Sequence, residues 1–373
     1  MFSAPLALAA ALALPAADPA RPSDWPQWRG PGRDAVCTET GLLDSWPAGG
    51  PPLAWVSSGL GRGYSTPSVA AGRVFGMSYQ GNNEVVWCVR ADNGRKLWTT
   101  AVAAKQSNEG PNSTPTIDGG RVYALGVSGD LVCLDGNTGK LVWKRSLPRD
   151  LGGKMMSGWG YSESVLVDGD KLICTPGGDK AALAALDKKT GEPIWRSEIP
   201  GAGGAGYASV VASQVGDTKV YVTWLGSGLV GVRASDGKFL WRYTRARNGT
   251  ANIPTPIVKG EYVFCSTAYG AGSALLKQVP ARDNGVEVKE VYFLNANSLQ
   301  NHHGGMVLVG DHVYLGHGHN AGQPRCIELM TGKHAWPQER GPRGTDGSAA
   351  VLYADGKLYF RYQNGVMALI EAA

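Results

Sequence analysis

The sequence predicts an all-β fold, a seven-bladed β-propeller made of four-stranded antiparallel blades. Three observations predict it: a unit of four strand-like runs that recurs along the chain, tryptophans at nearly regular intervals, and a last unit that lacks its fourth run. Propeller blades have four strands and periods of about 40 to 50 residues. The 373 residues are therefore expected to form one ring rather than two or three ordinary domains.

The clearest copy of the repeat covers residues 113–143. It divides into four short runs rich in β-branched and aromatic residues, and turn residues separate the runs. Between the third and fourth runs, an aspartate can bond its own backbone and a glycine can take the left-handed conformation that tight turns require. The four strands are predicted at Pro115–Ile117, Arg121–Leu125, Asp130–Leu134 and Lys140–Lys144.

A tryptophan marks the outer strand of most repeats. These residues are Trp55, Trp98, Trp143, Trp195, Trp241 and Trp336. The first five are 43 to 52 residues apart, and the last gap of 95 residues has room for two units. A degenerate repeat from Pro254 to Leu294 fills that gap, with Phe293 or a neighbour in the place of the tryptophan. A large flat indole suits packing between sheets, so each ring is expected between two neighbouring blades.

The two ends of the chain are expected to complete one blade together. The last unit, Gly347–Ile370, supplies only three strands. The missing outer strand is predicted in Leu53–Ser57, paired with Val366–Ile370, where it would cover an edge that otherwise invites aggregation. The predicted organisation is a signal peptide at 1–20, an N-terminal segment at 21–52 and a propeller at 53–373.

The beginning of the chain predicts export to the periplasm, the cell envelope or the exterior. Residues 2–20 hold an Ala/Leu run followed by small residues, which is typical of a signal peptide cleaved near Ala16–Ala20, although no Lys or Arg precedes Arg21. The run is too short for a membrane span, and no second candidate span follows. The basic residues behind the net charge of +5 are scattered, so nucleic acid is not an expected partner.

The turns and tryptophans described above resemble the pyrroloquinoline-quinone (PQQ) type of propeller repeat. That repeat occurs in quinoprotein dehydrogenases and in the lipoprotein propeller of bacterial outer-membrane assembly. The opening Asp24-Trp-Pro-Gln-Trp-Arg-Gly-Pro-Gly-Arg33 is similar to the start of exported PQQ-like propellers that are common in planctomycete-like bacteria. The resemblance covers the chain from Asp24 to its C-terminus, and it is specific for the fold rather than for a function.

Function is expected on the face of the ring that carries the long loops. The connections between blades and the turns between the second and third strands share that face, and long, varied loops on a rigid scaffold are common binding sites. Side chains that lead into each inner strand should line the mouth of the central channel, where they would suit a polar ligand. The alternative is that polar residues are simply common at loop ends. The predicted cofactor- or ligand-binding residues are Arg62, Tyr64, Asn112, Trp159, Tyr161, Glu163 and Asn252, with Asp346 as the catalytic candidate.

All six histidines fall within one repeat, which predicts a second kind of site. His302 and His303 precede its first strand, and His317-Gly-His319 ends its second strand, where side chains at i and i+2 share a face. Both pairs are therefore expected at the same rim, and imidazoles are common ligands of transition metals. The sequence predicts a metal site made of His302, His303, His317 and His319, and the alternative is a polar rim that binds nothing.

Three function classes stay open at this point. The leading one is a binding or scaffold propeller whose loop face and central channel take a protein, a glycan or a small polar ligand. The second is a quinoprotein oxidoreductase that oxidises an alcohol or a sugar with PQQ and Ca²⁺, for which the resemblance implies oxygen ligands such as Glu163, Asn252 and Asp346. The third is a cell-envelope assembly propeller. Seven blades instead of eight, no adjacent cysteines and no CxxCH haem motif weigh against the enzyme.

Overall fold

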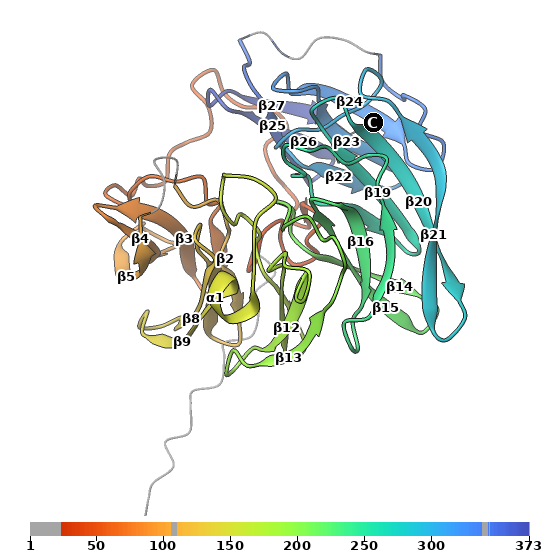
Figure 1. The fold of residues 1–373 in the computed structure, drawn as a ribbon. Helices are drawn as coiled ribbons and strands as arrows, with labels where there is room; N and C mark the ends of the chain where they lie inside the picture. Colours follow the sequence, from red (N-terminus) through yellow and green to blue (C-terminus); the bar gives the residue numbers. More distant parts are fainter. Residues whose placement is uncertain (1–23, 106–109, 338–341, 343, 373) are drawn as a thin grey trace, which may run out of the picture.

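The fold is a ring of β-sheets. The computed structural model describes residues 24–105, 110–337, 342 and 344–372, so the predicted signal peptide at 1–20 lies outside it. These residues form seven sheets around an axis, six with four strands and one with three (Figure 1). The single helix among them is α1 (Leu147–Leu151), in the connection between the second and third sheets. The predicted seven-bladed propeller is confirmed.

The first four blades follow the predicted order, in which neighbouring strands in the chain are neighbours in the sheet. Blade 1 consists of β2 (Ser68–Ala70), β3 (Arg73–Gln80), β4 (Asn83–Arg90) and β5 (Lys96–Ala104). Blade 2 consists of β6 (Thr116–Asp118), β7 (Arg121–Leu125), β8 (Asp130–Asp135) and β9 (Leu141–Ser146). Blade 3 consists of β10 (Leu166–Asp168), β11 (Lys171–Cys174), β12 (Leu183–Asp187) and β13 (Pro193–Ser197). Blade 4 consists of β14 (Val211–Val215), β15 (Thr218–Leu225), β16 (Gly228–Arg233) and β17 (Phe239–Tyr243).

The remaining blades depart from this pattern in their outer parts. Blade 5 consists of β18 (Ile257–Lys259), β19 (Tyr262–Thr267), β20 (Gly272–Ala281) and β21 (Gly285–Leu294), and its last two strands form a long hairpin. Blade 6 consists of β22 (Met306–Val309), β23 (His312–His317) and β24 (Gln323–Glu328). Its fourth run makes a single bridge, from Ile327 to His334. Blade 7 consists of β25 (Ala349–Ala354), β26 (Lys357–Tyr362) and β27 (Met367–Glu371), with β1 (Val36–Cys37) beside β25.

One hydrogen bond recurs where the outer part of the chain docks on a blade, except at Trp241, which donates to Gln278 Oε1 instead. An aromatic side chain donates a hydrogen bond to the carbonyl oxygen three residues before the glycine of the next blade's last turn. The donors and acceptors are Trp55 to Ala91 (3.0 Å), Trp98 to Gly136 (3.1 Å), Trp143 to Lys188 (3.1 Å), Trp195 to Ala234 (3.3 Å) and Tyr292 to Leu329 (2.7 Å). Tyr292, a neighbour of Phe293, thus takes the tryptophan's place in blade 5.

The glycine in that turn is needed both for its backbone and for the space beside it. Gly139 has φ of +70°, and a Cβ atom there would lie 2.6 Å from the Trp98 ring. We expect Gly139→Ala to lower the free energy of unfolding by about 1–3 kcal/mol more than Gly169→Ala does, because overpacking adds to the strain of the left-handed backbone. Gly169 is the matched control, since its φ is +61° and it faces open space. Equal losses in chemical denaturation would show that the indole contact contributes nothing.

Hydroxyl groups link the inner strands of neighbouring blades. The backbone N–H of Thr114 in blade 2 donates to Ser164 Oγ in blade 3 at 2.9 Å, and the N–H of Ser164 donates to Ser209 Oγ in blade 4 at 3.0 Å. The N–H of Ser209 continues the series to Thr255 Oγ1 in blade 5, also at 3.0 Å. Each bond satisfies a buried donor at the point where the chain enters a blade. These links hold four consecutive blades at a common level around the axis.

Residues 24–37, here called the N-terminal plug, fill the middle of the ring. The red segment in Figure 1 lies among the inner strands of the blades. Trp25 forms a bridge with Val69 of blade 1, and the Ile117 N–H of blade 2 donates to the Pro26 carbonyl at 2.7 Å. At the other end of the plug, β1 pairs in parallel with β25 of blade 7. The sequence placed the start of the propeller at residue 53, whereas the plug is part of its core.

Closure of the ring differs from the prediction. Leu53–Ser57 form no strand, and among the described residues no strand pairs with the outer side of β27, so the predicted pairing of Leu53–Ser57 with Val366–Ile370 is wrong. The N-terminal region joins blade 7 through β1, at the inner side instead. Pro51 and Pro52 lack the N–H groups that a strand ladder needs, which disfavours pairing just before Leu53. Trp55 still docks on blade 1 in the way that Trp98 docks on blade 2.

Candidate functional site

Two arginines of the plug, Arg29 and Arg33, are buried inside the ring. The Arg33 guanidinium donates to the carbonyl oxygens of Ser164 (2.7 Å) and Val165 (3.2 Å) in blade 3, and to Gln27 Oε1 (2.9 Å). Arg29 donates to the Met306 carbonyl of blade 6 and to the Asp34 carbonyl. Burial lowers the pKa of both groups to about 10. The plug therefore connects opposite sides of the ring through charge-assisted hydrogen bonds.

Glu163, predicted as a cofactor ligand, belongs to this interior network. Its carboxylate is fully buried and accepts hydrogen bonds from the Thr175 backbone N–H (2.7 Å) and hydroxyl (3.0 Å). Burial raises the pKa of Glu163 to about 7, while the Thr175 bonds and the charge of Arg33 act in the opposite direction. Its oxygens are already engaged with blade 3, so it is a partner of the plug in the core.

Two further predicted residues have their polar atoms paired within the fold. Asn252 is fully buried; its Oδ1 accepts from the Asn248 N–H at 2.9 Å, and its Nδ2 donates to the Leu225 carbonyl at 3.0 Å. The Tyr161 hydroxyl donates to the Pro176 carbonyl at 2.9 Å, and burial raises the pKa of this phenol. Both side chains brace connections at the loop face.

The other predicted residues lie at the rim. Arg62, Tyr64, Trp159 and Asp346 are exposed, and the Asn112 amide donates to Ser162 Oγ at 3.2 Å. The indole of Trp159 packs edge-on against Tyr207, with ring centroids 6.0 Å apart. Tyr207 in turn shares a 2.6 Å hydrogen bond with Ser157. Trp159 is therefore an exposed ring on a fixed support.

The interior does not fit a quinone beside a cation on the channel axis. The proposed oxygen ligands Glu163 and Asn252 are engaged with neighbouring protein groups, and exposed Asp346 lies in another blade. The nearby plug carries the guanidinium of Arg33, which would repel a Ca²⁺ ion at Glu163.

Imidazole rings gather at the rim between blades 5 and 6. The rings of His302 and His303 stack with their centroids 3.5 Å apart. The centroid of the His319 ring lies 4.1 Å from that of His302. Tyr269 meets this group edge-on, 4.5 Å from the His319 ring and 5.1 Å from the His302 ring. Burial lowers the pKa of His302 to about 4, and His303 adds to the effect. We call His302, His303, His319 and Tyr269 the histidine cluster.

His317 lies apart from this cluster, contrary to the expectation that it shares a rim position with His319. Its Nδ1 accepts from the Gln300 N–H at 3.2 Å, and burial, Arg325 and His334 lower its pKa to about 4. The alternation of a strand does not reach His319, because β23 ends at His317 and Gly318 takes φ of +95°. In the described part of the chain, no three His, Cys, Asp or Glu side chains already converge on a metal position.

Sequence reasoning missed Tyr269 as a candidate site residue. Tyr269 stands in the turn between β19 and β20 with a left-handed φ of 58°, and its hydroxyl lies 3.1 Å from His302 Nε2. The sequence signal for Tyr269 is a large residue between Ala and Gly in a short turn. Large residues are unusual in turns that require positive φ.

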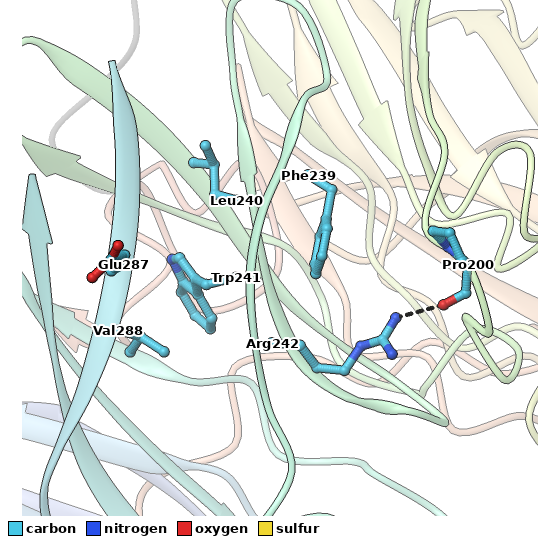
Figure 2. A pocket seen from close by; sticks show the side chains of 7 residues that line it. All are labelled: Pro200, Phe239, Leu240, Trp241, Arg242, Glu287 and Val288. Carbon is cyan, nitrogen blue, oxygen red and sulfur yellow. Dashed lines mark hydrogen bonds between the residues drawn. The ribbon is translucent and has the colours of Figure 1, made fainter. Parts of the chain in front are cut away.

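An open groove of about 690 Å³ lies away from the rim, on the outer side of blades 4 and 5. Phe239 and Trp241 of β17 and Val288 of β21 line it; Figure 2 shows Trp241 on the side of Val288 and Phe239 on the side of Pro200. The Arg242 guanidinium donates to the Pro200 carbonyl at 2.9 Å at one end (Figure 2). None of the residues predicted as a site lines this groove.

Sequence comparisons relate the chain to one family. A family model described as "Outer membrane protein assembly factor BamB" matches residues 82–338. BamB of Kangiella koreensis is 27% identical over 187 residues, which is 48% of this chain and 42% of that protein. BamB of Salmonella typhimurium is 26% identical over 212 residues, covering 52% and 45% respectively. The matched part thus spans less than half the length of these two curated relatives.

Solved structures share the fold at low identity. BamB from Moraxella catarrhalis has a TM-score of 0.56 and 16% identity, covering 83% of this chain and 82% of that chain. A quinohemoprotein alcohol dehydrogenase from Pseudomonas putida has a TM-score of 0.59 and 16% identity, covering 94% and 71%. Such likeness shows the fold alone. The planctomycete-like assignment depends on residues 24–33, which precede the family match, and stays a prediction.

Proposed function

Because this chain belongs to the family described as outer membrane protein assembly factor BamB, we propose that it is an exported propeller that binds a cell-envelope protein through its loop face. One observation carries the proposal: large aromatic side chains stand exposed around that face. The exposed fractions are 68% for Tyr64, 47% for Trp159 and 38% for Tyr269. They come from the segment that leads into blade 1, from the connection into blade 3 and from a turn of blade 5.

Exposed aromatic rings on rigid supports are suited to protein recognition. Tyrosine and tryptophan are enriched at protein interfaces, where a few buried rings supply much of the binding energy. Trp159 rests on Tyr207, and Tyr269 rests on the rings of His302 and His319. Since these supports limit the rotamers of the free protein, little conformational entropy is lost when a partner covers them.

The family's name supports an envelope protein as the partner class. The relatives matched above are named outer membrane protein assembly factors. Export would place this chain in the same compartment as such a partner, and no helix of the described residues is long and apolar enough to cross a membrane. A native protein whose N-terminal sequence begins at Met1 would contradict export.

The binding proposal is tested with the full mature chain as bait in envelope extract of the source bacterium. We expect chemical cross-linking and mass spectrometry to identify an envelope protein whose cross-links lie on the loop face. The double variant Trp159→Ala/Tyr269→Ala is expected to weaken capture at least tenfold, since each lost hot spot costs about 2 kcal/mol or more.

The matched control is Ile194→Ala/Val291→Ala, which removes exposed apolar side chains from the outer strands of blades 3 and 5. It should capture the partner as the wild type does. Equal loss in both double variants would indicate nonspecific hydrophobic adsorption. Unchanged capture by Trp159→Ala/Tyr269→Ala, or recovery of glycan alone, would overturn the proposed loop-face protein interface.

A further inference from the structure

Two chain segments supply the imidazoles of the histidine cluster, and a third segment supplies its tyrosine. His302 and His303 lie in the connection into blade 6, His319 lies in the turn after β23, and Tyr269 comes from blade 5. The ring centroids of His303 and His319 stand 3.5 Å and 4.1 Å from that of His302. The imidazoles of His303 and His319 therefore both lie in ring contact with that of His302.

The hydrogen bonds of His302 leave one ring nitrogen with its lone pair. His302 Nδ1 lies 2.7 Å from Asn320 Oδ1, and since an amide oxygen only accepts, Nδ1 carries the proton and donates. His302 Nε2 then has the lone pair, which accepts from the Tyr269 hydroxyl at 3.1 Å. A histidine whose second nitrogen donates to an amide or carboxylate oxygen is the usual arrangement of a metal ligand.

The other two imidazoles of the cluster lie at the protein surface. The His303 and His319 side chains are exposed, and His303 has one long contact, 3.5 Å, with the Gln363 amide. On a tetrahedral ion with metal–nitrogen distances of about 2.0–2.1 Å, ligand nitrogens lie roughly 3.3 Å apart. The stacked rings must therefore rotate and separate to share an ion, since no three such ligand side chains of the described residues converge on one position as they stand.

We infer that His302, His303 and His319 bind one transition-metal ion at the rim once their rings have turned, and that the ion replaces the Tyr269 hydrogen bond at His302 Nε2. An all-imidazole set selects Cu²⁺, Zn²⁺ or Ni²⁺ over Ca²⁺ and Mg²⁺, which prefer oxygen ligands. His317 is excluded from the site, because its Nδ1 bonds to the Gln300 N–H in a separate cluster. Three protein ligands leave a position for water or for a side chain of a bound partner.

The inference is tested by titrating the purified, metal-free mature chain with Zn²⁺, and separately with Cu²⁺, in isothermal calorimetry. We expect one ion per chain, and we expect His319→Ala to weaken binding at least tenfold. His317→Ala is the matched control from the same strand end and should bind as the wild type does. Electron paramagnetic resonance of the Cu²⁺ form should show nitrogen couplings that decrease in number in His303→Ala.

Two outcomes would overturn the inference. One is that the wild type binds no more metal than the triple variant His302→Ala/His303→Ala/His319→Ala. The other is that His317→Ala loses as much affinity for the metal as His319→Ala does. Since His319 is exposed, its variant should keep the fold, and a circular dichroism melt without metal checks this. Because the chain is tested alone, the result does not depend on whether the loop face binds a protein.

Discussion

Replacing Arg33 with leucine is expected to lower the free energy of unfolding by about 3–5 kcal/mol, the cost of removing one partner from a buried charged network. The variant would leave the carbonyl oxygens of Ser164 and Val165 without their donor. It would also leave the buried carboxylate of Glu163 without the neighbouring positive charge. Because Arg33 ties the plug to blade 3, we expect the plug to detach before the blades unfold.

Chemical denaturation together with limited proteolysis measures this effect. The control is Arg196→Leu, which removes an exposed arginine from β13 of the same blade and should change stability little. Arg33→Lys keeps the charge but loses the planar fork of donors, so an intermediate loss is expected. If Arg33→Leu is as stable as Arg196→Leu, the plug does not stabilise the ring.

The blades were predictable because each carries local signals that agree with one another. The Trp98 indole and Gly139, for instance, mark an outer strand and the turn on which it docks, and both lie within one repeat length. Neighbouring strands also pair in chain order, so the register of β6 to β9 follows from turn positions. Repetition then extends one correct blade to the whole ring.

The plug and the inner site were not predictable for a physical reason. Arg29 and Arg33 stand in a short Gly- and Pro-rich segment without periodicity, and their burial depends on carbonyl groups of blades 3 and 6, far away in sequence. Glu163 lies in the segment that leads into the inner strand β10, but its engagement by Thr175 depends on the neighbouring strand. Residue type alone did not distinguish a core carboxylate from a ligand.

The pH dependence of stability should reveal the buried carboxyl groups. Burial raises the pKa of Glu84 to about 7, with Asp130 adding to the rise, while the Val127 N–H and Lys144 oppose it. Glu84 is fully buried in β4 and accepts from the Val127 N–H of blade 2 at 3.2 and 3.3 Å. A carboxyl group whose pKa is raised by folding binds more protons in the native state, so its contribution to stability falls as pH rises from about 4.5 to 7.

Glu84→Gln should remove this dependence, because the amide oxygen still accepts from Val127 but does not ionise. Relative to the wild type, we expect the variant to gain up to about 3 kcal/mol between pH 4.5 and pH 8, at 1.36 kcal/mol per pKa unit. The comparison must be between variants, since the lowered pKa values of His302 and His317 give the opposite slope between about pH 4 and 6.5. Exposed Glu287→Gln controls for the substitution itself. Urea denaturation at several pH values gives the difference in free energy of unfolding between Glu84→Gln and the wild type. If that difference stays constant from pH 4.5 to 8, Glu84 has the same pKa in the folded and unfolded chains. The interface between blades 1 and 2 would then accept the charge of Glu84 without a loss of stability.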